Sequence, residues 1–409
     1  MSEPEIFDLA LGAEVRAARI EAALDADPRL GQQWRAEVGI AEAVCSVGLE
    51  DVRISAPGLL QRIVRNRIGE LDTSAAENAL AILRFIRSPF SGQGGGAGCM
   101  ERVMRFCPSP GSGEAPWPGP EELAGVFEHC RGRAPILEAL RASGTFGLMT
   151  ERRSPVAERL VFMAAEHLSR SKSAQAVGPR RDDPLRGLGG RYDASWIIPP
   201  ALSLIADGFR IWSPVGHARA LIEGIDRQLG REIGRIGTVR RWVSEADRVS
   251  QARHGRSRIH DAVRAFTIEP LMSIPQLAER IAVTERGALN LMLAMREQGL
   301  VVELTRRRSS RYWATPALAS MLVDADPGAV DTGGRRRSAP ASRVGDRPDE
   351  RGGIKPGGPV DLKRAHPPRA LKAEAEESMS RAMESFDRAL DEADAILSRI
   401  HMKTKPQDR

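Results

Sequence analysis

The stretch SIPQLAERIAVTERGALNLMLAMREQGLVVELTRRRSSRYWA, residues 273–314, carries the clearest structural signal in the chain. Ser273 with Gln276 three residues later is a capping-box pair at a helix N-terminus, and Pro275 suits a first helical turn. The short segment 282–283 then precedes Thr284, a second candidate N-cap. The sequence therefore predicts two helices joined by a tight turn.

The apolar residues of both segments recur at helical spacing, as expected for helices that share a core. They are Ile274, Leu277, Ala278 and Ile281 in the first segment, and Ala288, Leu291, Met292 and Met295 in the second. Gly299 stands where a left-handed C-cap belongs. The runs 301–304 and 311–314 then flank the segment 305–310, TRRRSS, which predicts a β-hairpin with a basic tip. A helix-turn-helix followed by such a hairpin is a winged helix-turn-helix.

In a helix-turn-helix unit the second helix lies in the DNA groove, with its N-terminal residues nearest the base edges. Arginine and asparagine are residue types that read base edges, whereas arginines on a wing suit phosphates, which add affinity without sequence information. The predicted DNA-binding residues are Arg286 and Asn290 at base edges, with Arg296, Arg306, Arg307, Arg308 and Arg311 beside them. The alternative is a winged helix used only for protein contacts, which Leu289 and Leu293 on the outer face of the second helix would suit.

The composition agrees with a helical, polyanion-binding protein. The net charge of +6 favours association with polyanions, although basic residues also form ordinary solvated surfaces. Only 4% of the 409 residues are aromatic, which favours helix over sheet, and the length allows two to three domains. No apolar run is long enough for a membrane span, and the acidic N-terminal residues do not resemble a signal peptide. With four cysteines in a chain of this length, we expect a cytoplasmic protein without a membrane partner.

The expected fold is mainly α, in six parts. They are a helical segment over 1–87, Gly/Pro-rich loops over 88–120, a continuation of the helical domain over 121–255, the winged helix-turn-helix over 256–320, a disordered linker over 325–369 and an amphipathic or coiled-coil helix over 370–402. A long helix is predicted after Pro214, with its apolar residues on one side: Leu221, Ile222, Ile225, Leu229, Ile233 and Val239. Its four glycines are predicted to let another helix pack closely: Gly224, Gly230, Gly234 and Gly237.

The C-terminal segment has apolar residues at alternating spacings of four and three, which is an a/d heptad seam. The predicted oligomerisation residues are Met379, Met383, Phe386, Leu390, Leu397 and Ile400, with Ala393 between them. The seam spans about three heptads, which is short for an independent coiled coil. Two interpretations remain open: a homodimer or partner contact, and an amphipathic helix that docks on its own chain.

The sequence shows no pattern of a reaction or cofactor site. No P-loop, G-x-S-x-G or H-E-x-x-H motif is present. The segment 92–97 fits a loose G-x-G-x-x-A pattern, but no strand precedes it, so no dinucleotide site is expected. Cys99, Cys107, Cys130 and His129 lack the short spacings of zinc ligands. We therefore expect no catalytic residue, no metal and no cofactor.

Two segments resemble those of an uncharacterised bacterial family, common on plasmids and mobile elements, that joins a helical domain to a C-terminal helix-turn-helix. They are 41–50, AEAVCSVGLE, and 273–314. The resemblance covers roughly 5–315 and implies a transcriptional regulator or plasmid-associated factor, with an effector, oligomerisation or partner module in front of the DNA-binding unit.

That layout is in turn similar to Fic-domain proteins, which transfer adenylyl groups with the motif H-P-F-x-[D/E]-G-N-G-R. The segment 220–225 looks like the helix that follows a Fic core, and 88–94, SPFSGQG, is a faint echo of the motif without its histidine and arginine. The resemblance therefore implies a catalytically silent relative.

Overall fold

The computed structural model describes residues 3–48, 73–91, 94–108, 117–151, 154–177, 192–206, 212, 214, 217–251, 258–304 and 311–325. These residues are mainly helical, as the composition predicts, with one small antiparallel sheet of three strands. They belong to one compact unit, Met1–Pro327, so the segment 256–320 is not set apart from the helices that precede it. The predicted linker and heptad seam lie outside the described residues.

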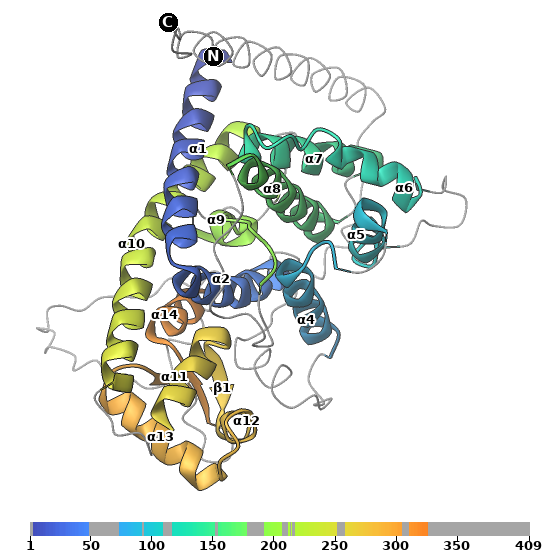
Figure 1. The fold of residues 1–409 in the computed structure, drawn as a ribbon. Coiled ribbons are helices and arrows are strands. Elements are labelled where there is room, and N and C mark those ends of the chain that lie inside the picture. Colours follow the sequence, from blue (N-terminus) through green and yellow to red (C-terminus); the bar gives the residue numbers. More distant parts are fainter. Residues whose placement is uncertain are drawn as a thin grey trace, which may run out of the picture. The chain divides into compact units, whose positions relative to one another are not determined.

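The N-terminal part consists of helices, of which α1, α4, α9 and α10 pack on α2 (Figure 1). In chain order they are α1 (Glu3–Ala26), α2 (Pro28–Gly48), α4 (Thr73–Arg87), α5 (Gly95–Met104), α6 (Pro120–Leu123), α7 (Pro135–Met149), α8 (Pro155–Val177), α9 (Pro200–Ala206) and α10 (Ala218–Gln251). A short 3₁₀ helix, Ala124–Phe127, follows α6. Residues 33–47 of α2 are all buried, because α1, α4, α9, α10, α11 and α14 pack around this helix. Helix α2 is therefore the centre of the core.

Helix α1 lies along α10 because its inward positions carry small side chains. Ala10, Ala13 and Ala17 are buried, followed by Ile20 and Leu24 at the same helical spacing. Alanines at these positions allow two helix axes to approach closely. This pairing covers one side of α10 and leaves the other side to solvent.

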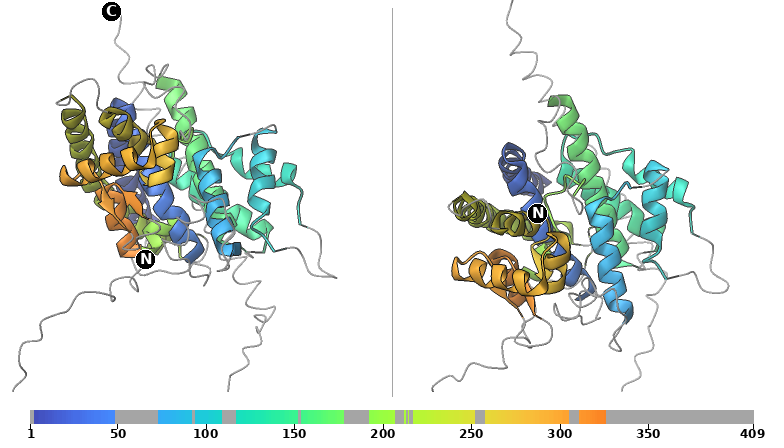
Figure 2. Two further views of the ribbon diagram at one scale, coloured as in Figure 1. Left: turned by 90° about the horizontal axis from the view of Figure 1, so that it is seen from below. Right: turned by 60° about the horizontal axis from the view of Figure 1, so that its bottom comes forward.

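The remaining elements, from residue 259 onward, lie beside α2 and α10, apart from the α5–α8 group (Figure 2). They are α11 (Ile259–Ile268), β1 (Leu271–Ser273), α12 (Ile274–Arg280), α13 (Glu285–Glu297), β2 (Val302–Glu303), β3 (Tyr312–Ala314) and α14 (Pro316–Ala325). Strand β3 is central in the sheet, and both its neighbours run antiparallel to it, with Met272 and Glu303 opposite Trp313.

Two expectations about the helical part are wrong. The predicted loops at 88–120 contain α5, which forms despite its glycines because Cys99, Met100 and Val103 on one of its faces are buried. On α10, Ile233 is 44% exposed rather than buried. A Cβ placed on Gly230, Gly234 or Gly237 would meet no atom within 4 Å, so these three face solvent and none of the described helices packs on them, whereas Gly224 is buried. The other apolar residues of the predicted face, Leu221, Ile222, Ile225, Leu229 and Val239, are buried as expected.

Candidate functional site

The turn between α12 and α13 forms as the local sequence predicts. The Ser273 hydroxyl accepts from the Gln276 backbone N–H at 3.4 Å, and the Ser273 N–H donates to Gln276 Oε1 at 3.0 Å, so the capping box is complete. Thr284 Oγ1 accepts from the Gly287 N–H at 3.2 Å at the start of α13. Gly299 adopts the left-handed conformation, with φ of 70°, just beyond the end of that helix. These local bonds fix where each helix begins and ends.

Helix α13 presents a polar face at its N-terminal half. Arg286 and Asn290 are exposed, whereas Ala288, Met292 and Met295 are buried against the neighbouring helices. Leu289 and Leu293, predicted on the outer face, are only partly exposed, because they lie at the edge of the buried stripe. The two side chains predicted to read bases thus share the solvent-facing side of α13.

Two other predicted DNA-binding residues are held against the sheet. The guanidinium carbon of Arg296 lies 5.9 Å from the centroid of the Trp313 ring, and the ring itself is buried. Arg311 Nε lies 3.4 Å from Glu303 Oε1 across the β2–β3 pair. A cation over an aromatic ring keeps its charge but loses freedom of movement. Arg306, Arg307 and Arg308 lie outside the described residues.

The charge of the described residues of this segment is nearly balanced. Over 258–304 and 311–325, six arginines stand against seven carboxylates, and three more arginines occur within 305–310. Several of the six are paired, as in Arg280–Glu269 at 2.7 Å and Arg258–Asp261 at 3.1 Å. Any strong attraction for a polyanion therefore needs the arginines of 305–310, or a second basic surface.

The segment 258–325 is docked on the helical part through buried polar contacts. Trp242 Nε1 on α10 donates to the Leu300 carbonyl at 2.7 Å. Thr315 Oγ1, between β3 and α14, donates to Glu37 Oε1 on α2 at 2.7 Å. Burial raises the pKa of Glu37 to about 6, against the hydrogen bonds from Thr315 and Gln33 that lower it. Sequence reasoning missed this junction, since nothing in the local pattern pairs Glu37 with Thr315.

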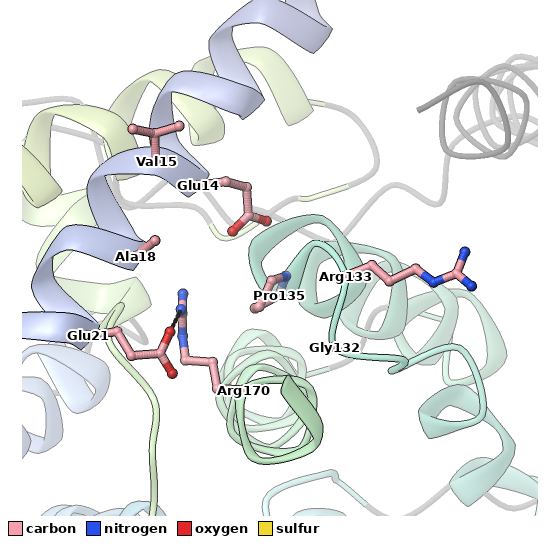
Figure 3. A pocket seen from close by; sticks show the side chains of 8 residues that line it. All are labelled: Glu14, Val15, Ala18, Glu21, Gly132, Arg133, Pro135 and Arg170. Carbon is pink, nitrogen blue, oxygen red and sulfur yellow. Dashed lines mark hydrogen bonds and ion pairs between the residues drawn. The ribbon is translucent and has the colours of Figure 1, made fainter. Parts of the chain in front are cut away.

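A shallow pocket of about 260 Å³ lies between α1, the start of α7 and the end of α8 (Figure 3). The residues that line it are Glu14, Val15, Ala18, Glu21, Gly132, Arg133, Pro135 and Arg170. Glu14 Oε1 accepts from the Ile136 N–H at 2.7 Å, and Arg170 Nη1 donates to Glu21 at 2.9 Å. Burial raises the pKa of Glu14 to about 7. These bonds join α1 to α7 and α8. The polar groups of the pocket therefore serve helix packing.

The described residues contain no group of three His, Cys, Asp or Glu side chains placed to hold a metal ion. Burial raises the pKa of Cys99 and of Cys130 to about 12, which keeps both as thiols at neutral pH. Among the described helices, none combines the length and the apolar character needed to cross a membrane.

Comparison of the sequence with protein-family models and with curated protein sequences finds no match.

Proposed function

We propose that residues 256–320 form a winged helix-turn-helix that binds DNA, in a transcriptional regulator or a plasmid- or mobile-element-associated factor. The observation that carries the proposal is the order of elements, α11-β1-α12-α13-β2-β3, in which the first half of α13 presents Arg286 and Asn290 to solvent. A second helix with exposed base-reading side chains at its N-terminal half is the arrangement by which helix-turn-helix proteins enter the major groove. The resemblance to the plasmid-borne family supports the same function.

In this proposal the arginines have separate roles. Arg286 and Asn290 read base edges, which gives sequence preference. Arg306, Arg307 and Arg308 contact phosphates, which gives affinity for any sequence and a dependence on salt. Arg296 and Arg311 stay on the sheet and contribute charge close to the DNA backbone.

The test is fluorescence anisotropy of the full chain, with a duplex selected from a random pool and a random duplex, across a salt series. We expect the Arg306→Ala/Arg307→Ala/Arg308→Ala variant to weaken binding to both duplexes and to lower the slope of log K against log salt by about 2.7. We expect Arg286→Ala to cost about 1–3 kcal/mol on the selected duplex and little on the random one.

The matched control is Arg84→Ala/Arg105→Ala, which removes two exposed charges from α4 and from the residue after α5. It should leave both affinities within about twofold, because screened charges far from an interface act weakly. Equal losses on both duplexes for Arg286→Ala would contradict a base-reading role.

A second candidate function is a protein-interaction scaffold, for which Val302, 41% exposed on β2, and the partly exposed Leu289 and Leu293 would supply apolar contacts. No binding of the full chain to either duplex at low salt, together with salt-insensitive self-association, would select the scaffold.

A further inference from the structure

The side of α10 that faces away from α1 and α2 is basic over a long stretch, here called the α10 outer face. It consists of the exposed residues Arg227, Gly230, Arg231, Ile233, Gly234, Gly237, Thr238, Arg240, Arg241 and Ser244. Positions three and four apart in a helix share one side, so these residues form a continuous strip. At 1.5 Å per residue, the distance from Arg227 to Arg241 is about 21 Å, roughly six nucleotide steps along a DNA strand.

The carboxylates of the same stretch are turned inward. Asp226 is in an ion pair with Arg16 of α1. Glu232 is fully buried and accepts from Trp34 Nε1 at 2.9 Å, from Gln228 and from Arg235. No acidic side chain therefore lies on the α10 outer face between 227 and 244. The exposed charged residues of the strip are therefore all arginines.

Three glycines, at 230, 234 and 237, lie among these arginines. A Cβ on each would enter open space, so their presence has no explanation in the packing of this chain. Glycine in a helix interior costs about 1 kcal/mol relative to alanine. What the glycines provide is a flat backbone surface that a bulky partner can approach closely, with arginines at its edges.

The α10 outer face adjoins the segment that carries α13. Trp242, next to Arg240 and Arg241, donates to the carbonyl of Leu300, three residues beyond the end of α13. Arg235 Nη1 lies 3.5 Å from the carbonyl of Ala317 at the start of α14. The basic strip is thus fixed to the candidate DNA-binding segment by direct contacts, on a helix 34 residues long.

We propose that the α10 outer face binds the phosphate backbone of DNA beside the site contacted by α13. This inference rests on the proposed function for the identity of the partner, which is DNA. The contact itself is separate, since α10 would bind phosphates without reading bases. The α10 outer face would add to the attraction from Arg306, Arg307 and Arg308, next to described residues whose own charges nearly balance.

The decisive variant is Gly234→Glu, in the middle of the strip. Its Cβ meets open space and glutamate is the better helix former, so the fold is retained while a carboxylate and extra bulk enter the α10 outer face. We expect a loss of DNA affinity of about tenfold on both the selected and the random duplex, because phosphate contacts carry no sequence information. Gly234→Ala is the matched control and should stay within about twofold of the parent, with equal or greater thermal stability.

A second variant, Arg240→Gln/Arg241→Gln, should lower the slope of log K against log salt by about 1.8 and keep the ratio of the two affinities unchanged. This inference alone is overturned if both α10 variants keep the parent's affinity and its slope of log K against log salt, while the Arg306/Arg307/Arg308 variant still loses binding. A different result would overturn the winged-helix proposal: Gly234→Glu loses DNA binding, whereas Arg286→Ala and the Arg306/Arg307/Arg308 variant keep it. The α10 outer face would then be the DNA site.

Discussion

Several buried glutamates hold helices together by accepting from backbone N–H groups of distant segments. Glu42 on α2 accepts from the N–H groups of Ala201 and Leu202, both at 3.1 Å, at the start of α9. Glu166 on α8 accepts from the N–H groups of Ile197 and Ile198, in the segment that precedes α9. A carboxylate at a helix N-terminus satisfies N–H groups that have no partner within the helix. These glutamates stabilise the fold, although their carboxyl groups are of a type that also serves in acid–base chemistry.

Glu42 makes stability depend on pH. Burial raises its pKa from 4.5 to about 7, although Arg159 and the backbone N–H groups lower it. Because the folded protein holds this proton more tightly than the unfolded chain, the stabilisation is present below pH 4.5 and is lost as pH rises toward 7. We expect the free energy of unfolding to fall by roughly 1 kcal/mol per pH unit in this window from Glu42 alone. Urea titrations at several pH values measure it.

Glu42→Gln provides the control for that titration. It removes the proton but keeps one oxygen that can accept from α9, so the variant is less stable overall and the slope of stability against pH becomes shallower. An unchanged slope would show that Glu42 does not hold the extra proton.

For single residues, contacts within one helical turn were predictable from the sequence, and contacts between distant segments were not. Ser273 and Gln276 belong to one helical turn, so their bond follows from spacing. Glu42 and Ala201 are 159 positions apart, and an isolated glutamate in an apolar helix gives no indication of its partner. The contact between Glu37 and Thr315 was not predictable for the same reason.

At the scale of the elements, the backbone of α2 lies close against Tyr192 at Gly39. A Cβ at this position would lie 2.2 Å from the Tyr192 hydroxyl oxygen, a distance that real contacts do not reach. We expect Gly39→Ala to destabilise the protein by about 1–3 kcal/mol, because overpacking forces neighbouring side chains out of their positions. Thermal unfolding followed by circular dichroism measures the change.

Removing the obstructing atom should return part of that stability. In Gly39→Ala/Tyr192→Phe the nearest oxygen is gone, so the double variant should unfold at a higher temperature than Gly39→Ala. If the double variant is no more stable than Gly39→Ala, or if the losses of the two single variants simply add, the close contact with Tyr192 is not the cause of the destabilisation.

The periodicity of apolar residues predicted most helices but not always their orientation. It placed α12 and α13 correctly, and the break after α1, because capping residues mark their ends. On α10 it placed most apolar residues correctly but put Ile233, Gly230, Gly234 and Gly237 on the packed side, since glycine has no side chain to show which way it faces. Helix α5 was expected to be a loop because its first residues are glycines, and tertiary burial of Cys99 and Met100 outweighs their poor propensity.

At the level of the whole unit, the contact between Glu37 and Thr315 joins α2 to the segment that carries β3. Thr315→Val keeps the shape but leaves the Glu37 carboxylate with one donor fewer, so the pKa of Glu37 should rise further. We expect a loss of about 1–3 kcal/mol near pH 8 and a smaller loss near pH 5, where Glu37 is protonated. Urea unfolding followed by tryptophan fluorescence and by circular dichroism measures it.

Both probes should shift together, since the described residues to 325 form one compact unit. Two separate transitions in the unfolding curve would show that the segment 258–325 unfolds on its own and that the contact does not couple it to α2. Thr315→Ser, which keeps the hydroxyl, is the control.

The carboxylate caps also set an order of events during synthesis. Helix α9 has seven residues, too few to be stable alone, and its capping group Glu42 leaves the ribosome 159 residues before Ala201. At about 5–20 residues per second, this interval lasts on the order of ten seconds or more. During that time the sides of α2 that α9, α10, α11 and α14 later cover stay without these partners, so the nascent chain exposes apolar surface until its last helices are made.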